Sequence, residues 1–439
     1  MDSISIYDLF LKNFQAENLE DCRHIINQSE FDVNHIYTQD ELKTKLQNFP
    51  IDASTLTLNV LQLIARLGKQ WSLVLIQSII ERSVGGGAVT VDLDLPNSDG
   101  WTALMMAAGY SKTDSSLETV ELLIRAGAKL DLQKKNGSTA LMIAACYSNS
   151  TSSIETVQTL IMAGAKLDLQ NKEGWTALMY AVRFSNDTSS FETVELLFRD
   201  GANLDLQDKE GQTALMIAAC YSNETSSLET VELLIRAGAN LDLQKANGST
   251  ALMIAAFYSN TSSSLETVEL LIRASAKLDL QNNEGWTALM WSAFYFNASS
   301  SLETVELLIR AGAKLDLQNN EGWTALMLSA GYSQTSSSLE TVELLIRAGA
   351  KLDLKNKHGR TALMVNANNL FCSLENTSSL ETVKLLIQAG EKLDLQDKEG
   401  LTNLLKAAVY SANSSSLETV ATLILDSINQ GKISHNKIH

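Results

Sequence analysis

The strongest constraint on the fold is a unit of 37 residues that the chain repeats in strict register. The block Thr-Ala-Leu-Met begins at eight positions, each 37 residues after the last: Thr102, Thr139, Thr176, Thr213, Thr250, Thr287, Thr324 and Thr361. A ninth, degraded copy starts at Thr402 after 41 residues, and we expect the four extra residues to form a loop insertion within 366–376. Such a period predicts a repeat architecture, in which each unit buries its apolar face only by stacking on its neighbours.

Each unit begins with a turn and a short helix. In the copy at 205–211 the turn is polar and ends at Gly211, which can adopt a positive φ angle. The next segment, 213–219, predicts a short helix with Thr213 as its N-cap. A polar loop at 222–225 follows and leads to the second half of the unit.

The second half of the unit predicts a longer amphipathic helix over 228–237. Ser226 and Glu229 have the spacing of a capping box at its start. Gly238 stands where a helix C-terminal glycine is expected. The apolar side chains recur on one face, at Leu228, Val231, Leu234 and Ile235.

These residues resemble the ankyrin repeat. The shared pattern is Gly-x-Thr-Ala-Leu-x-x-Ala-Ala followed by Glu-Thr-Val-Glu-Leu-Leu-Ile-Arg-Ala-Gly-Ala-Asn-Leu-Asp, and it covers about 94–425. The resemblance implies an all-α fold, a solenoid of stacked helix-turn-helix units with short hairpin-like turns. The unit exceeds the family's usual ~33 residues, with the excess in the Ser/Thr/Asn-rich loop between the helices.

Two departures from the family pattern also bear on structure. Ala replaces the usual Pro after the first Thr, and Met replaces a frequent His two residues later. We interpret the resulting methionines as a buried structural ridge: Met105, Met142, Met179, Met216, Met253, Met290, Met327 and Met364.

The chain divides into three parts by this pattern. Residues 1–93 lack the signature but predict two degenerate helix pairs that cap the stack, because terminal repeats are usually atypical. The alternative is that 1–93 form a separate small domain with its own activity. Nine repeats occupy 94–431, and 432–439 form a polar tail. The four N-terminal helices are expected over 6–14, 19–26, 56–67 and 71–80.

Charge and composition exclude several classes of partner. The chain has 34 Lys and Arg residues against 51 Asp and Glu residues, a net charge of −17, which argues against nucleic-acid binding. We also expect no membrane span, since no apolar stretch is long enough, and no secretory signal, since the N-terminus lacks a basic start and an apolar run.

The cysteines indicate a reducing compartment. Cys146 and Cys220 are two units apart, about 20 Å if helices pack at their usual spacing, which is too far for a disulfide. We therefore expect reduced thiols and a cytoplasmic protein. The near identity of the copies also resembles arrays encoded by giant viruses and intracellular bacteria, which would imply a host cytosol.

No cluster of residues in the sequence predicts catalysis. The five histidines are scattered, and Gly85-Gly86-Gly87 lacks the Lys and helix of a phosphate loop. Single aspartates such as Asp205 and Asp242 recur once per unit, which we interpret as a solvated edge. We therefore expect no enzyme activity, cofactor, metal or small-molecule substrate, and a monomer.

The informative positions are those at which the copies differ. The residue before each Thr varies among Trp, Ser, Gln, Arg and Leu, and in the ankyrin family this position faces the groove. Eight residues after the Thr runs an aromatic row that hardly varies, broken at Asn369 and resumed at Tyr410. We interpret its tyrosines as packing under the loop, with binding as the alternative. Trp and Tyr often anchor interfaces, and the candidate partner-binding residues are Trp175, Arg183, Phe257, Tyr258, Trp286, Trp291, Phe294, Tyr295, Trp323, Tyr332 and Arg360.

The resemblance implies a scaffold that binds a protein along its concave groove. The negative charge favours a neutral or basic partner, and the densest aromatic segment, 257–323, is the expected hot spot. Two alternatives remain open at this point. One is an adaptor whose residues 1–93 carry a second activity, and the other is a spacer without a specific partner.

Overall fold

The computed structural model divides the chain into two compact units, residues 1–209 and 210–439. It describes residues 6–16, 18–28, 32, 34–37, 58–67, 72–84, 91–294, 302–331, 336–370, 377–392 and 395–400.

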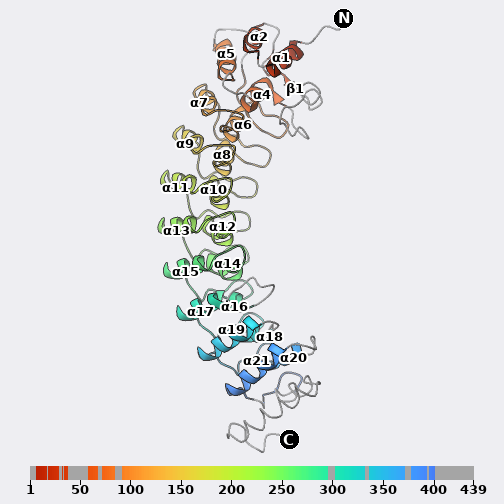
Figure 1. The fold of residues 1–439 in the computed structure, drawn as a ribbon, viewed down its shortest axis with the longest axis vertical. Helices are drawn as coiled ribbons and strands as arrows, with labels where there is room; N and C mark the ends of the chain where they lie inside the picture. Colours follow the sequence, from red (N-terminus) through yellow and green to blue (C-terminus); the bar gives the residue numbers. More distant parts are fainter. Residues whose placement is uncertain are drawn as a thin grey trace, which may run out of the picture. The chain divides into compact units, whose positions relative to one another are not determined.

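The first unit consists of helix pairs in two layers (Figure 1). Helix α4 packs on α6, α6 on α8 and α8 on α10, while α5 packs on α7, α7 on α9 and α9 on α11. The helices are α1 (Ile6–Gln15), α2 (Leu19–Ile26), α4 (Val60–Leu67), α5 (Ser72–Val84), α6 (Ala103–Gly109), α7 (Leu117–Arg125), α8 (Ala140–Cys146), α9 (Ile154–Met162), α10 (Ala177–Arg183) and α11 (Phe191–Arg199).

The second unit repeats this arrangement. The even-numbered helices α12 to α20 pack in succession, and the odd-numbered helices α13 to α21 form the other layer. They are α12 (Ala214–Tyr221), α13 (Leu228–Arg236), α14 (Ala251–Tyr258), α15 (Leu265–Arg273), α16 (Ala288–Ala293), α17 (Leu302–Arg310), α18 (Ala325–Gly331), α19 (Ser336–Arg347), α20 (Ala362–Leu370) and α21 (Thr377–Gln388). The predicted all-α repeat fold is confirmed.

The N-terminal helix pairs follow the predicted positions closely. Helix α4 lies on the first repeat as each later first helix lies on its neighbour. The buried Gln62 side chain fastens this contact, because its amide donates to the carbonyl oxygens of Leu95 at 2.7 Å and Trp101 at 2.9 Å. A small antiparallel ladder between β1 (Ile36–Tyr37) and β2 (Leu58–Asn59), which the sequence does not predict, precedes α4.

The Thr N-cap prediction is confirmed and the capping-box prediction is wrong by one residue. Thr213 Oγ1 accepts the Met216 N–H at 3.3 Å. At the second helix the cap is Ser227, whose Oγ accepts the Thr230 N–H at 3.2 Å, and not Ser226. The two hydroxyls of Ser227 and Thr230 lie 3.1 Å apart, so Thr takes the place that the box assigns to Glu229.

Apolar side chains of the two layers fill the core. Val231 and Leu234 of α13 and Leu215 of α12 are at most 1% exposed. The eight methionines of the repeated block are at most 2% exposed, which confirms the buried ridge. Glycines after the second helices, such as Gly238 with φ of 88°, take the predicted left-handed conformation.

The polar loops of several repeats are bonded to the next repeat through a serine and a threonine. Ser222 at the end of α12 is 8% exposed, and Thr267 on α15 is fully buried. Thr267 Oγ1 donates to Ser222 Oγ at 2.7 Å, so two hydroxyls satisfy each other inside the stack. The same bond joins Ser111 to Thr156, Ser148 to Thr193 and Ser259 to Thr304.

The repeated aspartates are partly exposed, and they also bond to the next repeat, which their interpretation as a solvated edge does not include. Asp279 Oδ1 accepts the backbone N–H of Lys314 in the next repeat at 2.9 Å. Its Oδ2 lies 3.5 Å from the Lys314 ammonium. Asp94, Asp131, Asp168, Asp242 and Asp316 make the equivalent bond to the next backbone.

The turns stack with almost no free space. The Asn283 N–H donates to the Asn247 carbonyl of the preceding turn at 3.0 Å. A Cβ on Gly248, whose φ is 82°, would lie only 2.6 Å from that nitrogen. Glycine is therefore required here by conformation and by the approach of the next turn.

Several predictions fall at the limits of the described residues. The expected loop insertion at 366–376 is wrong in its first part, because α20 continues as helix to Leu370. The copy at Thr402, the tail 432–439, Gly85-Gly86-Gly87, Cys372, Tyr295 and Tyr332 lie outside the described residues. None of the described helices has the length and apolar character needed to cross a membrane.

Candidate functional site

Two kinds of variable position lie side by side in the structure, as the contact of Trp286 with Phe294 shows, and we call the face that they form the groove face. It is formed by the residue before the capping Thr and by the exposed side of the first helix, including its last turn. In the first unit this face is hollowed, and the hollow is lined by side chains from three successive repeats.

In the second unit the groove face carries an aromatic cluster formed by Phe257, Tyr258, Trp286, Trp291 and Phe294. Trp286 stacks on Trp291 with ring centroids 4.3 Å apart. Phe257 meets the edge of Trp291 at 5.0 Å, and Phe294 meets Trp286 at 5.2 Å. All five side chains are only half-buried. The rings thus support one another while leaving apolar surface accessible.

In the first unit the groove face holds an aromatic hollow of about 310 Å³, lined by Trp101, Tyr110, Tyr147 and Tyr180. Tyr147 is 42% exposed, so it does not pack under the loop as the sequence suggested. Burial of the ring raises the pKa of the Tyr180 phenol, which also accepts a hydrogen bond from the Asn171 amide at 2.9 Å.

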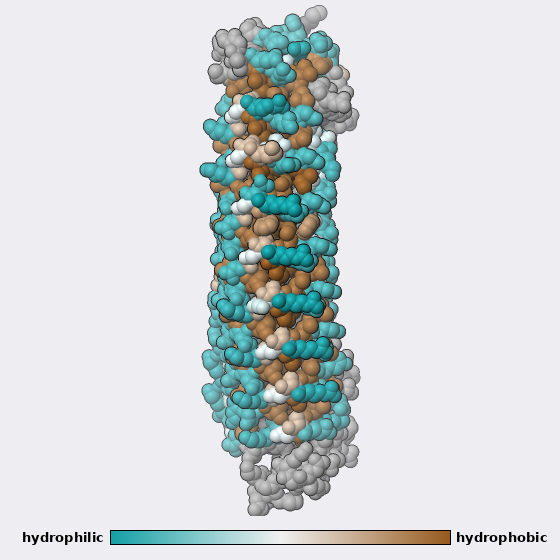
Figure 2. All heavy atoms as spheres, turned by 90° about the vertical axis from the view of Figure 1, so that its left-hand side faces the viewer, coloured by the Kyte–Doolittle hydropathy of each residue, from teal (hydrophilic) through white to brown (hydrophobic). Residues whose placement is uncertain are grey.

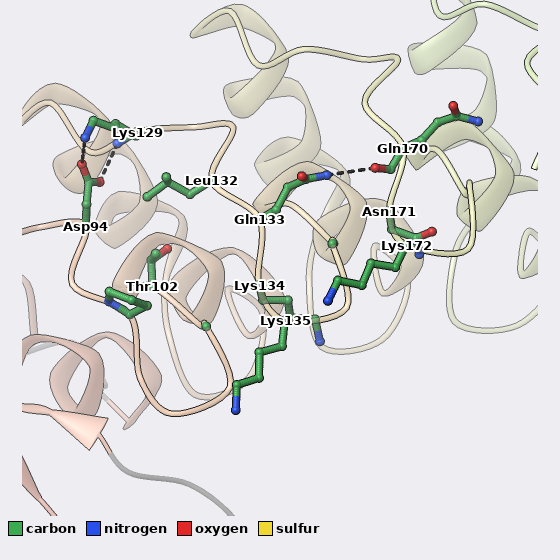
Figure 3. Close-up of a pocket in the computed structure, with 13 residues that line it drawn as sticks. Asp94, Thr102, Lys129, Leu132, Gln133, Lys134, Lys135, Gln170, Asn171 and Lys172 are labelled. Carbon is green, nitrogen blue, oxygen red and sulfur yellow. Dashed lines mark hydrogen bonds and ion pairs between the residues drawn. The ribbon is translucent and has the colours of Figure 1, made fainter.

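A second hollow of about 660 Å³ lies beside the first, among the turns of the same repeats. Figure 3 shows its lysines on successive turns. We call it the lysine hollow, after Lys129, Lys134, Lys135 and Lys172. The Lys134 side chain lines both hollows, and its ammonium lies 4.2 Å from the centroid of the Trp101 ring.

Comparison with known families gives this architecture a name. The sequence model described as Ankyrin repeats (3 copies) matches residues 61–152, 147–242, 219–300 and 294–375, more than half of the chain. The chain belongs to the ankyrin-repeat family. The first match begins within α4, so the family pattern extends upstream of the first Thr-Ala-Leu-Met block.

Among solved structures, the ankyrin repeat domain of Bcl-3, described as a unique member of the IkappaB protein family, is 26% identical. That likeness covers 56% of this chain and 96% of the other, with a TM-score of 0.45. A search of curated proteins found no match.

The ankyrin groove face contains the described candidate residues in different settings. Trp323 is half-buried, and within the described residues no ring contact joins it to the aromatic cluster. Trp175 packs against Tyr180 at 5.1 Å, and Arg183 lies 5.3 Å from the Phe184 ring. Arg360 forms an ion pair with Glu399 at 3.3 Å, so its guanidinium already has an anionic partner.

Sequence reasoning missed Tyr180 and the lysine hollow. Tyr180 stands four residues after the capping Thr, where Ile143, Ile217 and Ile254 occur in other copies. The same position carries Trp291, which was selected only because it falls in the densest aromatic segment. An aromatic substitution at an otherwise aliphatic position is the signal that would have found Tyr180.

The opposite face, formed by the second helices, has a different character (Figure 2). Hydrophilic side chains recur along it with hydrophobic ones between them. Glu269 pairs with Arg273 at 2.6 Å, and equivalent i,i+4 pairs recur on α7, α11, α13, α17 and α19. Exposed pairs of this kind contribute little energy, and they keep the face hydrated.

Burial sets the chemistry of the thiol in the aromatic hollow. Desolvation raises the pKa of Cys146 to about 12, against its ordinary value of 9.0. A nucleophilic cysteine needs a lowered pKa, so Cys146 acts as a small packing residue. Within the described ranges, no three His, Cys, Asp or Glu side chains are placed to hold one metal ion.

Proposed function

We propose that this protein is a non-catalytic scaffold that binds a protein partner along the groove face of its ankyrin repeats. The observation that carries the proposal is the aromatic cluster of the second unit. Its rings are half-exposed and packed against one another. Aromatic side chains in such settings supply most of the energy of many protein interfaces.

The contrast between the two faces supports the choice of surface. The second-helix face presents charged pairs that are hydrated, whereas the groove face differs from copy to copy and carries the aromatic rings. Variation at a fixed position on a constant scaffold is what recognition of a particular partner requires.

The test is capture of a partner by the full chain. The partner is recovered from host lysate, identified, purified and titrated against the wild type and the Trp286→Ala/Trp291→Ala variant. We expect the variant to lose at least about tenfold in affinity, because hot-spot aromatics each contribute more than ~1 kcal/mol. Helical content and thermal melting report whether the variant folds.

A matched control removes exposed apolar surface from the other face. Met162 on α9 is 80% exposed, so Met162→Ala should leave affinity unchanged. Equal affinity of the wild type and the double tryptophan variant would reject the groove face of the second unit as the binding surface.

We infer that residues 1–93 act as a cap and not as an independent effector domain. The packing of α4 on α6 and α5 on α7 supports this reading, as does the buried Gln62 contact with the first repeat. Deleting 1–93 should therefore lower the melting temperature of the remaining repeats. Unchanged melting with loss of a cellular effect would favour the adaptor alternative.

A reducing, intracellular setting and a monomeric state are part of the same proposal. Cys22, Cys146 and Cys220 are free thiols, which is consistent with such a setting. Cell fractionation tests the location, and sedimentation equilibrium tests the monomer; a secreted or dimeric protein would contradict it.

A further inference from the structure

Three lysines of the first unit, all in the lysine hollow, carry ammonium groups without a direct ion pair. Within the described residues, the ammonium groups of Lys134, Lys135 and Lys172 form no ion pair. Lys129 in the same hollow differs, because its ammonium pairs with Asp94 at 3.2 Å. Lys135 and Lys172 are exposed, and Lys134 is half-buried.

The position of Lys134 links this charge to apolar surface. Its side chain lies over the Trp101 ring and lines the hollow that Tyr147 and Tyr180 share. Burial lowers the pKa of Lys134 more than the nearby Asp99 carboxylate raises it. The ammonium is therefore partly dehydrated without a close counter-ion, so an incoming anion would replace lost hydration.

The local charge is opposite to that of the whole chain. A net charge of −17 favours neutral or basic partners at long range. At physiological ionic strength, however, exposed charges are screened beyond about 8 Å. A side chain docked in the lysine hollow therefore responds mainly to the charges close to it, which are the three ammonium groups and neighbouring carboxylates such as Asp99.

Discrete carboxylates fit this setting better than a continuous phosphate backbone. The lysines stand between acidic side chains of the same turns, including Asp99 and Glu173. A nucleic acid would place successive phosphates against these carboxylates. A peptide can place one or two carboxylates at the lysines and neutral residues elsewhere.

We propose that the joined aromatic and lysine hollows bind an acidic segment of a protein, in which a large apolar side chain is flanked by Asp or Glu. The apolar side chain enters the aromatic hollow between Trp101, Tyr147 and Tyr180. The flanking carboxylates pair with Lys134, Lys135 and Lys172. This inference rests on the proposed function and specifies the partner chemistry for the first unit.

The experiment selects a displayed random-peptide library on the full chain. We expect the selected peptides to share an aromatic or branched apolar residue next to Asp or Glu. A fluorescently labelled form of the most enriched peptide is then titrated against purified variants. Selection that yields no acidic enrichment over the input library overturns the proposal.

Charge and apolar contributions are measured with separate variants. Lys135→Gln/Lys172→Gln should weaken the peptide about 5- to 20-fold, the loss expected for two partly exposed ion pairs. Lys12→Gln/Lys112→Gln removes the same charge from exposed positions of the same unit that line neither hollow and should change affinity less than about twofold. Trp101→Ala should weaken the peptide at least about tenfold.

Two further outcomes distinguish an acidic-peptide site from a general charge effect and from a phosphate-binding surface. Equal losses for the two lysine pairs would show a general charge effect and overturn the site. Competition by mixed-sequence single-stranded RNA at lower concentration than the acidic peptide would identify a phosphate-binding surface, which also overturns it. If the acidic peptide does not bind as expected but Trp286 and Trp291 are still needed for partner capture, only the inference about the lysine hollow is wrong. If the full chain captures no partner through Trp286 and Trp291, the proposed function itself is wrong.

Discussion

At the scale of single residues, Ser275 departs from the pattern of its repeat. Its φ is 68°, a left-handed conformation that the other described copies fill with glycine, including Gly238 and Gly312. A Cβ at those two glycines would meet nothing within 4 Å. The free-energy cost of having serine at position 275 therefore comes from the left-handed backbone conformation and not from a clash of its Cβ with neighbouring atoms.

We predict that Ser275→Gly raises the free energy of unfolding by about 0.5–1 kcal/mol, because relief of the left-handed strain exceeds the added freedom of the unfolded chain. Urea unfolding measures the change. Gly312→Ser is the reciprocal control and should lower stability by a similar amount. An unchanged midpoint for both variants would contradict the account.

The raised pKa of the Cys146 thiol has a consequence at alkaline pH. The folded state holds the proton up to about pH 12, whereas an unfolded chain releases it near the ordinary value of 9.0. Between these values the unfolded state binds fewer protons, so stability falls as pH rises and is unaffected below this window.

We predict that the stability advantage of the wild type over Cys146→Ala shrinks by about 1 kcal/mol between about pH 8 and about pH 10. The difference between the two proteins cancels titration of other groups, and denaturant unfolding at each pH provides the measurement. A constant difference would show that the thiol titrates alike in both states.

At the scale of the element, the buried hydroxyl pairs hold neighbouring repeats in register. We predict that Ser222→Ala and Thr267→Val each cost about 0.5–1.5 kcal/mol, since each removes the hydrogen bond between the two buried hydroxyls while the remaining hydroxyl keeps a contact with Ser264. The double variant should cost less than the sum by about 1 kcal/mol.

The control for this cycle combines Ser222→Ala with Thr304→Val, which bonds to Ser259 and not to Ser222. Those two changes should be additive. Chemical denaturation of all variants gives the coupling energy, and zero coupling between Ser222 and Thr267 would mean that the hydroxyl pair adds no stability.

Helices were predictable from sequence because the evidence for each was repeated eight times. The helix expected over 228–237 is Leu228–Arg236, and the one expected over 213–219 is Ala214–Tyr221. The hydroxyl and aspartate hydrogen bonds between repeats were not predictable. Periodicity shows that Ser222 and Thr267 recur, but not that residues 45 apart in sequence become partners.

The candidate site was predictable in part for a similar reason. Variation among copies picked out Trp286 and Phe257, and the structure brings both against Trp291. The lysine hollow was not predictable from the sequence because lysine in a polar turn is ordinarily solvated. Only the packing of Lys134 over Trp101 distinguishes it, and that contact joins two turns.

At the scale of the whole molecule, the net charge of −17 is spread over repeated positions. Glu229, Glu266 and Glu303 occupy the same exposed place on successive second helices. Like charges on a compact chain repel one another, and salt screens that repulsion. Exposed ion pairs such as Glu269–Arg273 oppose the effect only weakly.

We therefore predict that the melting temperature rises by a few degrees when NaCl is raised from about 0.05 M to about 0.5 M. A variant carrying Glu229→Gln, Glu266→Gln and Glu303→Gln should respond less. A melting temperature that falls with salt would show that the ion pairs dominate over repulsion.

The hydroxyl and aspartate hydrogen bonds between repeats also affect how the length of the array can change. The threonine recurs every 37 residues from Thr119 to Thr341 and the aspartate from Asp94 to Asp353, and the serine recurs from Ser111 to Ser259 but is Phe296 in the next copy. The groove-face residues vary more often. Removing or duplicating one repeat within the stretch from Ser111 to Ser259 thus recreates the junction that it interrupts. Genetic recombination within the array can therefore change the number and order of recognition surfaces one repeat at a time, because no new contact between neighbouring repeats is needed.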